Sequence, residues 1–178
     1  MSAADGFDYQ PFYCEENIWR LCQHPRFAGD ELFVAIIANP AGAVRCRHQR
    51  AAGSTTYVDW DYHVVAFTCW EDGWNAWDFD SSLGLPTGAE DYLASTFRAD
   101  DAPELQPTFR VMPGAAYVRA LRSDRAHMRH RDGRWLQPPP TWAAPLTGTT
   151  PLMDLIDMDC GLPGEVLSLG ELRQRLEE

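Results

Sequence analysis

The hydrophobic pattern of the chain predicts strands in its middle part. Residues 32–38 (LFVAIIA) form a continuous apolar run that ends at Asn39-Pro40. Residues 62–70 (YHVVAFTCW) are rich in β-branched and aromatic side chains, which strands favour. This second run leads through the turn signal Glu71-Asp72-Gly73 into residues 74–80 (WNAWDFD), which predicts a β-hairpin. A weaker alternation over residues 44–50 predicts one further strand.

Helical patterns flank these strands. From residue 14 to residue 23 apolar side chains recur at helical spacing until Pro25 ends the pattern. Helices are also predicted over residues 91–97 and 115–121, and residues 137–151 form a proline-rich loop. A capping-box sequence, Ser168 followed by Glu171, predicts a final helix to Glu178. Strands in the middle with helices at both ends predict an α+β fold built on a central antiparallel sheet flanked by helices.

The length of 178 residues fits a single domain spanning residues 1–178. No apolar run reaches the roughly 18 residues of a membrane helix, and the first ten residues do not resemble a secretory signal. The five cysteines are odd in number and irregularly spaced, which indicates a reducing, cytoplasmic compartment rather than a disulfide framework. A monomer is expected, since no exposed apolar stripe argues for an assembly.

Charge and composition exclude several functions. The net charge of −11 argues against a nucleic-acid partner. The one basic stretch, residues 119–134, has six arginines at roughly helical spacing, and we interpret it as a solvated face. The chain contains no lysine, which excludes Schiff-base chemistry, pyridoxal phosphate anchoring and a P-loop. No zinc-ligand pair or dinucleotide-binding motif is present, so no metal or cofactor is expected.

The strongest candidate for chemistry is Cys14, at the start of the first predicted helix. The macrodipole and free N–H groups there would lower the pKa of the thiol and form an oxyanion hole. His63, on the strongest strand, is better placed as its base than the other four histidines, which lie in loops or polar stretches. The paired strand offers two orienting acids, Asp78 and Asp80. Five cysteines and five histidines always allow some such triple, so Cys14 as a core residue and His63 as a structural histidine remain open.

The predicted hairpin bears on the choice between the two aspartates. A two-residue turn at Asp72-Gly73 would place Asp78 opposite Phe67 and Asp80 opposite Val65, diagonal to His63. Both aspartates then share the face of His63, and ideal register favours Asp80 as the nearer one.

Five motifs together point to one family. They are YCEENIW (residues 13–19), WDYHVV (60–65), WDFD (77–80), SDRAHM (123–128), and GRW followed by PPP (133–140). In this order and spacing the chain resembles the protein N-terminal glutamine amidohydrolase family, from about Tyr13 to the C-terminal helix.

The resemblance implies a cysteine amidase with a fold and triad similar to those of transglutaminases and papain-like proteases. It implies Cys14 as nucleophile, His63 as general base and acid, and Asp78 as the orienting acid, with Asp80 as the alternative. The implied reaction releases ammonia from glutamine at the N-terminus of a protein or peptide, without a metal or cofactor. Rival functions are a transglutaminase-like acyltransferase, a cysteine peptidase with the same triad, and a non-enzymatic binding module.

Selectivity for an N-terminal residue requires a group that reads the α-ammonium. An acid in the pocket would do so through a charge-assisted hydrogen bond. Glu15, Glu16 and Asp61 flank the motifs and are candidates for substrate binding, together with Tyr13, although each acid could equally be a surface or helix-terminal charge. The SDRAHM and PPP motifs are expected to shape the pocket wall, unless Arg125 pairs with an acid and is structural.

Overall fold

The computed structural model describes residues 6–177 of the chain. Its α-helices are α1 (Cys14–Leu21), α2 (Ala89–Thr96), α3 (Gly114–Ala120), α4 (Leu152–Leu155) and α5 (Leu169–Glu177). Its 3₁₀ turns are η1 (Pro25–Phe27), η2 (Arg50–Ala52), η3 (Pro103–Leu105) and η4 (Ala126–Met128). Its strands are β1 (Glu31–Ala38), β2 (Val44–Arg47), β3 (Tyr57–Trp60), β4 (His63–Trp70), β5 (Gly73–Trp77), β6 (Thr87–Gly88), β7 (Thr108–Pro113), β8 (Leu121–Arg122), β9 (Thr150–Pro151) and β10 (Glu165–Ser168).

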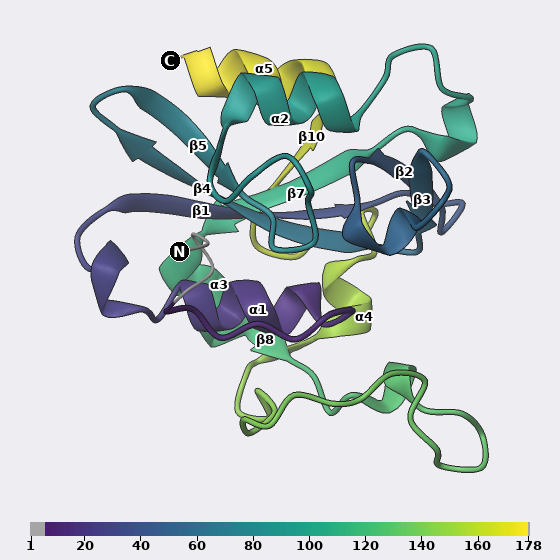
Figure 1. The fold of residues 1–178 in the computed structure, drawn as a ribbon. Coiled ribbons are helices and arrows are strands. Elements are labelled where there is room, and N and C mark those ends of the chain that lie inside the picture. The colour runs from purple at the N-terminus through teal and green to yellow at the C-terminus, as the bar shows by residue number, and fades with distance from the viewer. Residues whose placement is uncertain (1–5, 178) are drawn as a thin grey trace.

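A six-stranded antiparallel sheet forms the middle layer of the molecule, in the order β10-β7-β1-β4-β5-β6. Helices α2 and α5 cover one face, and α1, α3 and α4 cover the other (Figure 1). The predicted α+β fold with a central antiparallel sheet flanked by helices is therefore confirmed. Among residues 6–177, no helix is both long and apolar enough to cross a membrane.

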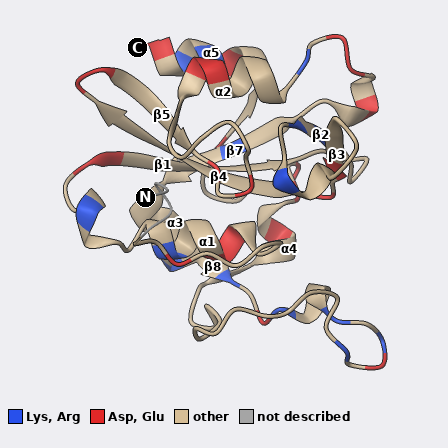
Figure 2. Ribbon diagram, viewed as in Figure 1, with Lys and Arg blue, Asp and Glu red and all other residues tan. Residues whose placement is uncertain are grey.

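The two faces of the sheet carry separate hydrophobic cores, because successive side chains of a strand point to opposite faces. In β1, Val34 and Ile36 pack into the core beneath α1, whereas Ala35 and Ile37 pack into the core beneath α2 and α5. The continuous apolar run of this strand thus reflects burial on both faces. Charged side chains lie mainly on the helices and connections, and the centre of the sheet is largely free of them (Figure 2).

The β4–β5 hairpin forms as predicted, but its register differs by two residues. Cys69 pairs with Trp74 and Ala66 with Trp77, so the turn is Glu71-Asp72. The prediction that Asp72-Gly73 forms the turn is wrong. Gly73 has φ 110°, a conformation that L-residues rarely adopt, and it begins β5 rather than ending the turn. Because the shift is even, the faces of the strands are preserved.

Three strands of the central sheet, β6, β7 and β10, were not predicted from the sequence. Strand β7 pairs with β1 on one side and with β10 on the other. In the middle of β7 lies Arg110, fully buried, which donates hydrogen bonds to the carbonyl oxygens of Leu155, Asp157, Cys160 and Leu162. These bonds satisfy the guanidinium without a carboxylate and order the loop after α4. A buried arginine also breaks the apolar pattern by which strands are recognised in sequence.

Two other predictions need correction. The proposed strand over residues 44–50 is shorter, ends at Arg47 and pairs with β3 in a separate two-stranded sheet. The arginine-rich segment 119–134 is not one helical face, because it spans the end of α3, the short strand β8, η4 and loops. Residues 123–149, which we call the arm, run beyond the layer of α1, α3 and α4 (Figure 1).

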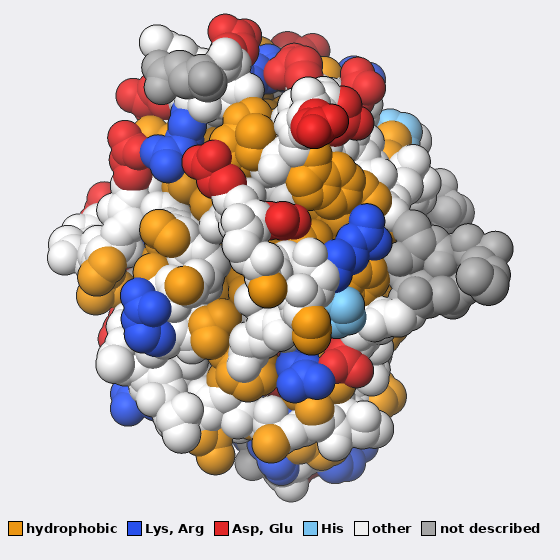
Figure 3. Space-filling view, turned by 90° about the vertical axis from the view of Figure 1, so that its left-hand side faces the viewer, with side chains coloured by type: hydrophobic (Ala, Val, Ile, Leu, Met, Phe, Trp, Pro, Cys, Tyr) orange, Lys and Arg blue, Asp and Glu red, His pale blue; other side chains and the backbone are white. Residues whose placement is uncertain are grey.

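The surface of the molecule mixes hydrophobic, polar and charged side chains on the face shown in Figure 3. On the face shown in Figure 3, acidic side chains gather toward the end that carries α2 and α5. Hydrophobic side chains there are distributed among polar and charged ones. Scattered apolar groups of this kind are usual for a protein surface.

Candidate active site

Cys14 is the first residue of α1, as predicted, and is 8% exposed. The backbone N–H groups of Glu16 and Asn17 donate to the carbonyl of Tyr13, the residue that caps the helix. Among residues 6–177, the N–H groups of Cys14 and Glu15 have no such acceptor. The Cys14 Sγ lies 3.9 Å from Oε2 of Glu15. The thiol is thus at a helix N-terminus with free backbone donors beside it.

The expected lowering of the thiol pKa is not observed. Burial raises the pKa of Cys14 well above its usual value, and the charges of Glu15 and Asp80 raise it further. A hydrogen bond from the backbone of Val64 acts in the opposite direction but is outweighed. In this structure Cys14 is therefore a neutral thiol, and a base must remove its proton before or during any nucleophilic attack.

His63 is the first residue of β4 and is 1% exposed. Its Nε2 lies 2.9 Å from Oδ1 of Asp78, which leaves Nδ1 as the other ring nitrogen for proton transfer. The indole of Trp60 stacks on the imidazole, with ring centroids 6.0 Å apart and an interplanar angle of 12°. Burial tends to lower the pKa of His63, but the charge and hydrogen bond of Asp78 outweigh it and raise that pKa.

Asp78 accepts four hydrogen bonds. Oδ1 is contacted by His63 and by the backbone N–H of Asp80 at 3.0 Å, and Oδ2 accepts from Gln49 Nε2 and Tyr92 Oη, each at 3.0 Å. Burial would raise the pKa of this carboxyl, but the charge and hydrogen bond of His63 and the other donors lower it. Asp78 is thus held as a buried carboxylate.

Asp80 does not bond to His63, although the ideal register of the hairpin favoured Asp80 as the nearer aspartate. Strand pairing ends at Trp77, and the chain then bends, so that Asp78 and not Asp80 reaches the imidazole. Asp80 Oδ1 instead accepts a hydrogen bond from Tyr9 Oη at 2.8 Å. Burial and the nearby charge of Asp78 raise the pKa of Asp80. The prediction of Asp80 as the nearer aspartate is therefore wrong.

Cys14 and His63 both line a cavity of about 140 Å³, which we call the Cys14 cavity. Its wall is formed by side chains from the start of α1, the β3–β4 connection, the end of the hairpin and the arm. The lining residues are Phe12, Cys14, Trp60, Asp61, Tyr62, His63, Asp80, His127, Met128 and Leu136. The thiol, the imidazole and a space for a small substrate group are thus brought together.

His63, Asp78 and Asp80 are also residue types that bind metal ions. Within residues 6–177, His63, Asp78 and Asp80 have potential ligand atoms within 4.8 Å of one another. Asp78 already accepts four hydrogen bonds, and Asp80 accepts one from Tyr9. These bonds satisfy both oxygens of Asp78 and engage one oxygen of Asp80 without an ion, so the arrangement fits a proton-transfer site better than a metal centre.

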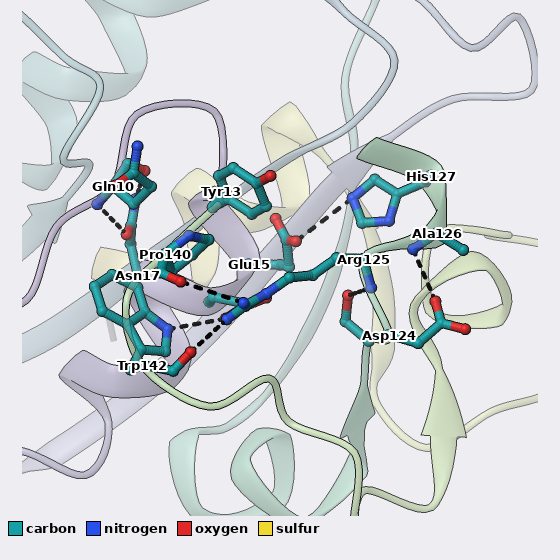
Figure 4. A network of polar contacts seen from close by, with 12 residues as sticks. Gln10, Tyr13, Glu15, Asn17, Asp124, Arg125, Ala126, His127, Pro140 and Trp142 are labelled. Atoms are coloured by element: carbon teal, nitrogen blue, oxygen red, sulfur yellow. Dashed lines mark hydrogen bonds and ion pairs between the residues drawn. The ribbon is translucent and has the colours of Figure 1, made fainter. Parts of the chain in front are cut away.

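Glu15 is fully buried, next to the nucleophile. Its Oε2 accepts a hydrogen bond from Tyr62 Oη at 3.0 Å, and its Oε1 lies 3.5 Å from Nε2 of His127 (Figure 4). Tyr62 Oη is also 3.1 Å from the same imidazole nitrogen. Burial tends to lower the pKa of His127, but the hydrogen bond and charge of Glu15 raise it. Glu15, Tyr62 and His127 thus form one buried network beside the Cys14 cavity.

Glu16 holds the arm against α1. Its carboxylate receives a bidentate ion pair from Arg125, with both N–O distances 2.7 Å, and accepts from Trp142 Nε1 at 2.9 Å (Figure 4). Arg125 also donates to the carbonyls of Pro140 and Trp142. The alternative that Arg125 pairs with an acid is correct. The motifs SDRAHM and PPP therefore meet α1 at this network, which supports the part of the arm that lines the cavity.

The predicted site residues separate into two groups. Cys14, His63, Asp61 and Asp80 line the cavity, and Asp78 stands behind His63. Tyr13, Glu15 and Glu16 are 0% exposed and are not among the lining residues. The Tyr13 hydroxyl donates to the carbonyl of Gln137, another contact between α1 and the arm.

Sequence reasoning missed the residues that support the triad-like arrangement. Gln49 donates to Asp78, and its own amide is oriented by a hydrogen bond from Trp60 Nε1 at 3.1 Å. Tyr92 reaches Asp78 from α2. His127 lies in a polar stretch of the sequence, and its place within SDRAHM is the one signal that indicates it. Gln49 and Tyr92 lie outside every motif, so no local signal identified them.

The chain is similar over most of its length to a family of known proteins. The family model described as N-terminal glutamine amidase matches residues 9–176. Proteins named protein N-terminal glutamine amidohydrolase are 38% identical in Drosophila grimshawi, covering 93% of this chain and 86% of the relative. The Homo sapiens protein of that name is 34% identical, covering 96% and 88%, and that of Drosophila pseudoobscura pseudoobscura is 39% identical, covering 92% and 85%. This chain belongs to the N-terminal glutamine amidase family.

Proposed function

We propose that the protein hydrolyses the side-chain amide of glutamine at the N-terminus of proteins and peptides, producing glutamate and ammonia. Two observations support this. The chain is similar over most of its length to proteins named for that reaction. Its Cys14 cavity combines a thiol at a helix N-terminus with an imidazole bonded to a carboxylate. The observation that carries the proposal is the presence of Cys14 and His63 in one cavity, with Asp78 2.9 Å behind the imidazole.

The first half of the reaction forms a thioester. Nδ1 of neutral His63 takes the proton of the Cys14 thiol while Sγ attacks the carboxamide carbon of the substrate. The carbonyl oxygen becomes an oxyanion, for which the free backbone N–H groups at the start of α1 are suitable donors. His63 then gives its proton to the amide nitrogen, the C–N bond breaks and ammonia leaves. Asp78 orients the ring and stabilises its cationic form.

The second half regenerates the enzyme. His63 accepts a proton from a water molecule as its oxygen attacks the thioester carbon. The C–S bond breaks, the sulfur recovers its proton from His63, and glutamate is released. No oxidant, metal or cofactor is required, because each proton removed from one group is returned to another.

The arrangement is that of a papain- or transglutaminase-like core within one domain, acting as a monomer. In support, the three residues occur in the chain order Cys, His, Asp, with the cysteine on a helix and the histidine at the start of a sheet strand. An acyltransferase or peptidase would use the same groups. Those reactions differ in the fate of the acyl group or in the bond cleaved, so their products distinguish them.

Ammonia release from a short peptide beginning with glutamine tests the proposal directly. We expect ammonia and an N-terminal glutamate from the free peptide, and little reaction with the same peptide acetylated at its N-terminus. Cys14→Ala should abolish the reaction, whereas Cys69→Ala, at a cysteine outside the Cys14 cavity, should retain it. A folded protein that cleaves the peptide backbone, or transfers the acyl group only to an added amine, would contradict the proposal.

A further inference from the structure

An enzyme specific for the first residue of a chain must distinguish a free α-ammonium from a peptide amide. Which residue of this protein makes that distinction is a question that rests on the proposed function. At neutral pH the α-amino group is largely charged, with an ordinary pKa of about 7.7–8.0. A carboxylate within reach would favour it, whereas an internal or acetylated glutamine offers no charge to bind. Four acids lie around the nucleophile, namely Glu15, Glu16, Asp61 and Asp80.

Two of these acids are already engaged in the interior. Both oxygens of Glu16 are bound to Arg125, and Trp142 adds a third donor. Glu15 is 0% exposed, holds the Tyr62 hydroxyl and faces His127. Neither belongs to the wall of the Cys14 cavity. A substrate cation would have to displace a buried partner to reach either one, which leaves that partner unsatisfied.

Asp80 does line the cavity but is poorly suited to bind an ammonium. It is 6% exposed and its Oδ1 is held by the hydroxyl of Tyr9. It also lies close to the imidazole of His63 and the carboxylate of Asp78. A second cation placed there would oppose the protonated form of His63, which the leaving ammonia requires.

Asp61 has the opposite properties. It is exposed, lines the same cavity as Cys14 and His63, and precedes His63 by two residues, just before β4. Its Oδ1 accepts a hydrogen bond from the backbone N–H of Tyr62 at 3.0 Å, which fixes the carboxylate. Among residues 6–177, Oδ2 has no hydrogen-bond or ion-pair partner. One oxygen is thus anchored, and the other has no protein partner among residues 6–177 and belongs to a side chain that lines the Cys14 cavity.

The length of the substrate side chain requires its carboxamide and its α-ammonium to contact different residues of the cavity. In glutamine, four covalent bonds separate the carboxamide carbon from the α-nitrogen, a span of about 5 Å when extended. A glutamine whose carboxamide lies at Cys14 therefore carries its α-ammonium about 5 Å away, where a different lining residue of the cavity must bind it. We propose that Asp61 binds the α-ammonium of the substrate and is the residue that restricts the reaction to N-terminal glutamine.

The experiment compares two peptides and four proteins, namely the wild type and the variants Asp61→Asn, Asp72→Asn and Asp80→Asn. One peptide begins with glutamine, and the other is its deamino analogue, in which hydrogen replaces the α-amino group and the carboxamide is retained. The ratio of their kcat/KM values measures recognition of the ammonium. Asp61→Asn keeps the size of the side chain and the oxygen that accepts from Tyr62. Asp72→Asn, in the β4–β5 turn, removes the same charge from an exposed residue that does not line the cavity and is the control.

We expect Asp61→Asn to lower kcat/KM for the glutamine peptide by roughly 10- to 100-fold, the range for a hydrogen bond to a charged group. The deamino peptide should react with the variant and the wild type alike, a pattern that mere damage to the fold would not produce. The control should keep the wild-type ratio.

Two results would overturn the inference. One is an unchanged ratio in Asp61→Asn, and if kcat/KM falls equally for both peptides, Asp61 is a structural residue. The other is a ratio that falls only in Asp80→Asn, because it would assign binding of the ammonium to Asp80. Absence of ammonia from the wild-type protein with either peptide would contradict the proposed function itself, and the inference with it.

Discussion

At the residue scale, opposing effects on His63 and Asp78 decide the protonation of the candidate site. Burial alone disfavours the charged form of both groups, and their mutual attraction restores it. Gln49 and Tyr92 add neutral donors to Asp78, so its carboxylate is satisfied even when His63 is neutral. The imidazole can then change its charge while its partner remains in place, as proton transfer requires.

Asp78→Asn should lower kcat strongly, because an amide neither stabilises the imidazolium nor accepts from all four donors. The corresponding change in a serine-protease triad costs about 10⁴-fold, and we expect a loss on the order of 10³-fold or more. The measurement is the steady-state rate of ammonia release. Asp80→Asn, which removes no bond to His63, is the comparison, and an equal loss in that variant would contradict the role of Asp78.

The pH dependence of kcat/KM should show an acidic limb above the ordinary histidine pKa of about 6.5. The pKa of His63 is raised, so its proton is retained to higher pH than usual, and only the neutral ring can accept from the Cys14 thiol. Activity should therefore fall as pH decreases through that pKa. A limb near pH 4 would instead indicate a preformed thiolate–imidazolium pair.

At the scale of elements, the arm is attached to α1 through a buried ion pair. Glu16 is 0% exposed, and Arg125 is 8% exposed with φ 61°, a left-handed conformation that is uncommon for an arginine. The pair, Trp142 and the carbonyls of the proline-rich loop satisfy one another. Since His127 and Met128 lie two and three residues after Arg125 and line the Cys14 cavity, this attachment fixes one wall of the site.

Removal of one partner of the Glu16–Arg125 ion pair should lower the free energy of unfolding more than removal of both partners. Arg125→Met leaves a buried unpaired carboxylate and should lower the free energy of unfolding by about 3–5 kcal/mol. Adding Glu16→Gln to that variant should recover part of the loss, because the uncompensated charge is gone. Urea denaturation of the single and double variants measures this coupling. Strictly additive losses would show that the two residues do not act as a pair.

At the scale of the whole molecule, the sheet connects the two cores and carries the site at one end. Strand β4 contributes to both cores and begins at His63, while α1 packs on one face and α2 supplies Tyr92 from the other. The site therefore depends on both layers being assembled. This arrangement supports the expectation of a single folding unit.

Thermal or denaturant unfolding should accordingly be one cooperative transition. Far-ultraviolet circular dichroism reports the helices and sheet, and fluorescence of the seven tryptophans reports packing on both faces. The two signals should give coincident curves, as for a two-state domain. Separate transitions would show that the layers or the arm unfold independently.

The local pattern of the sequence determined much of the fold. The helix at Cys14, the apolar strands, the hairpin and the capping box at Ser168, whose hydroxyl bonds to Glu171, depend on near neighbours and formed as expected. The motifs also indicated the family. Strands β6, β7 and β10 were not recognised. In β7 the buried Arg110 interrupts the apolar pattern, and its partners are carbonyls about 45–52 residues away.

Only the tertiary structure decided the details of the site. The end of strand pairing at Trp77 brought Asp78 to His63. An ideal hairpin continues its pairing, so the sequence pattern did not indicate where the pairing stops. Burial, which depends on every layer packed around a group, raised the pKa of Cys14 against the effect of its own helix. The acids at Glu15, Glu16 and Asp61 are alike in sequence, and they differ only in the partners that distant segments bring to them.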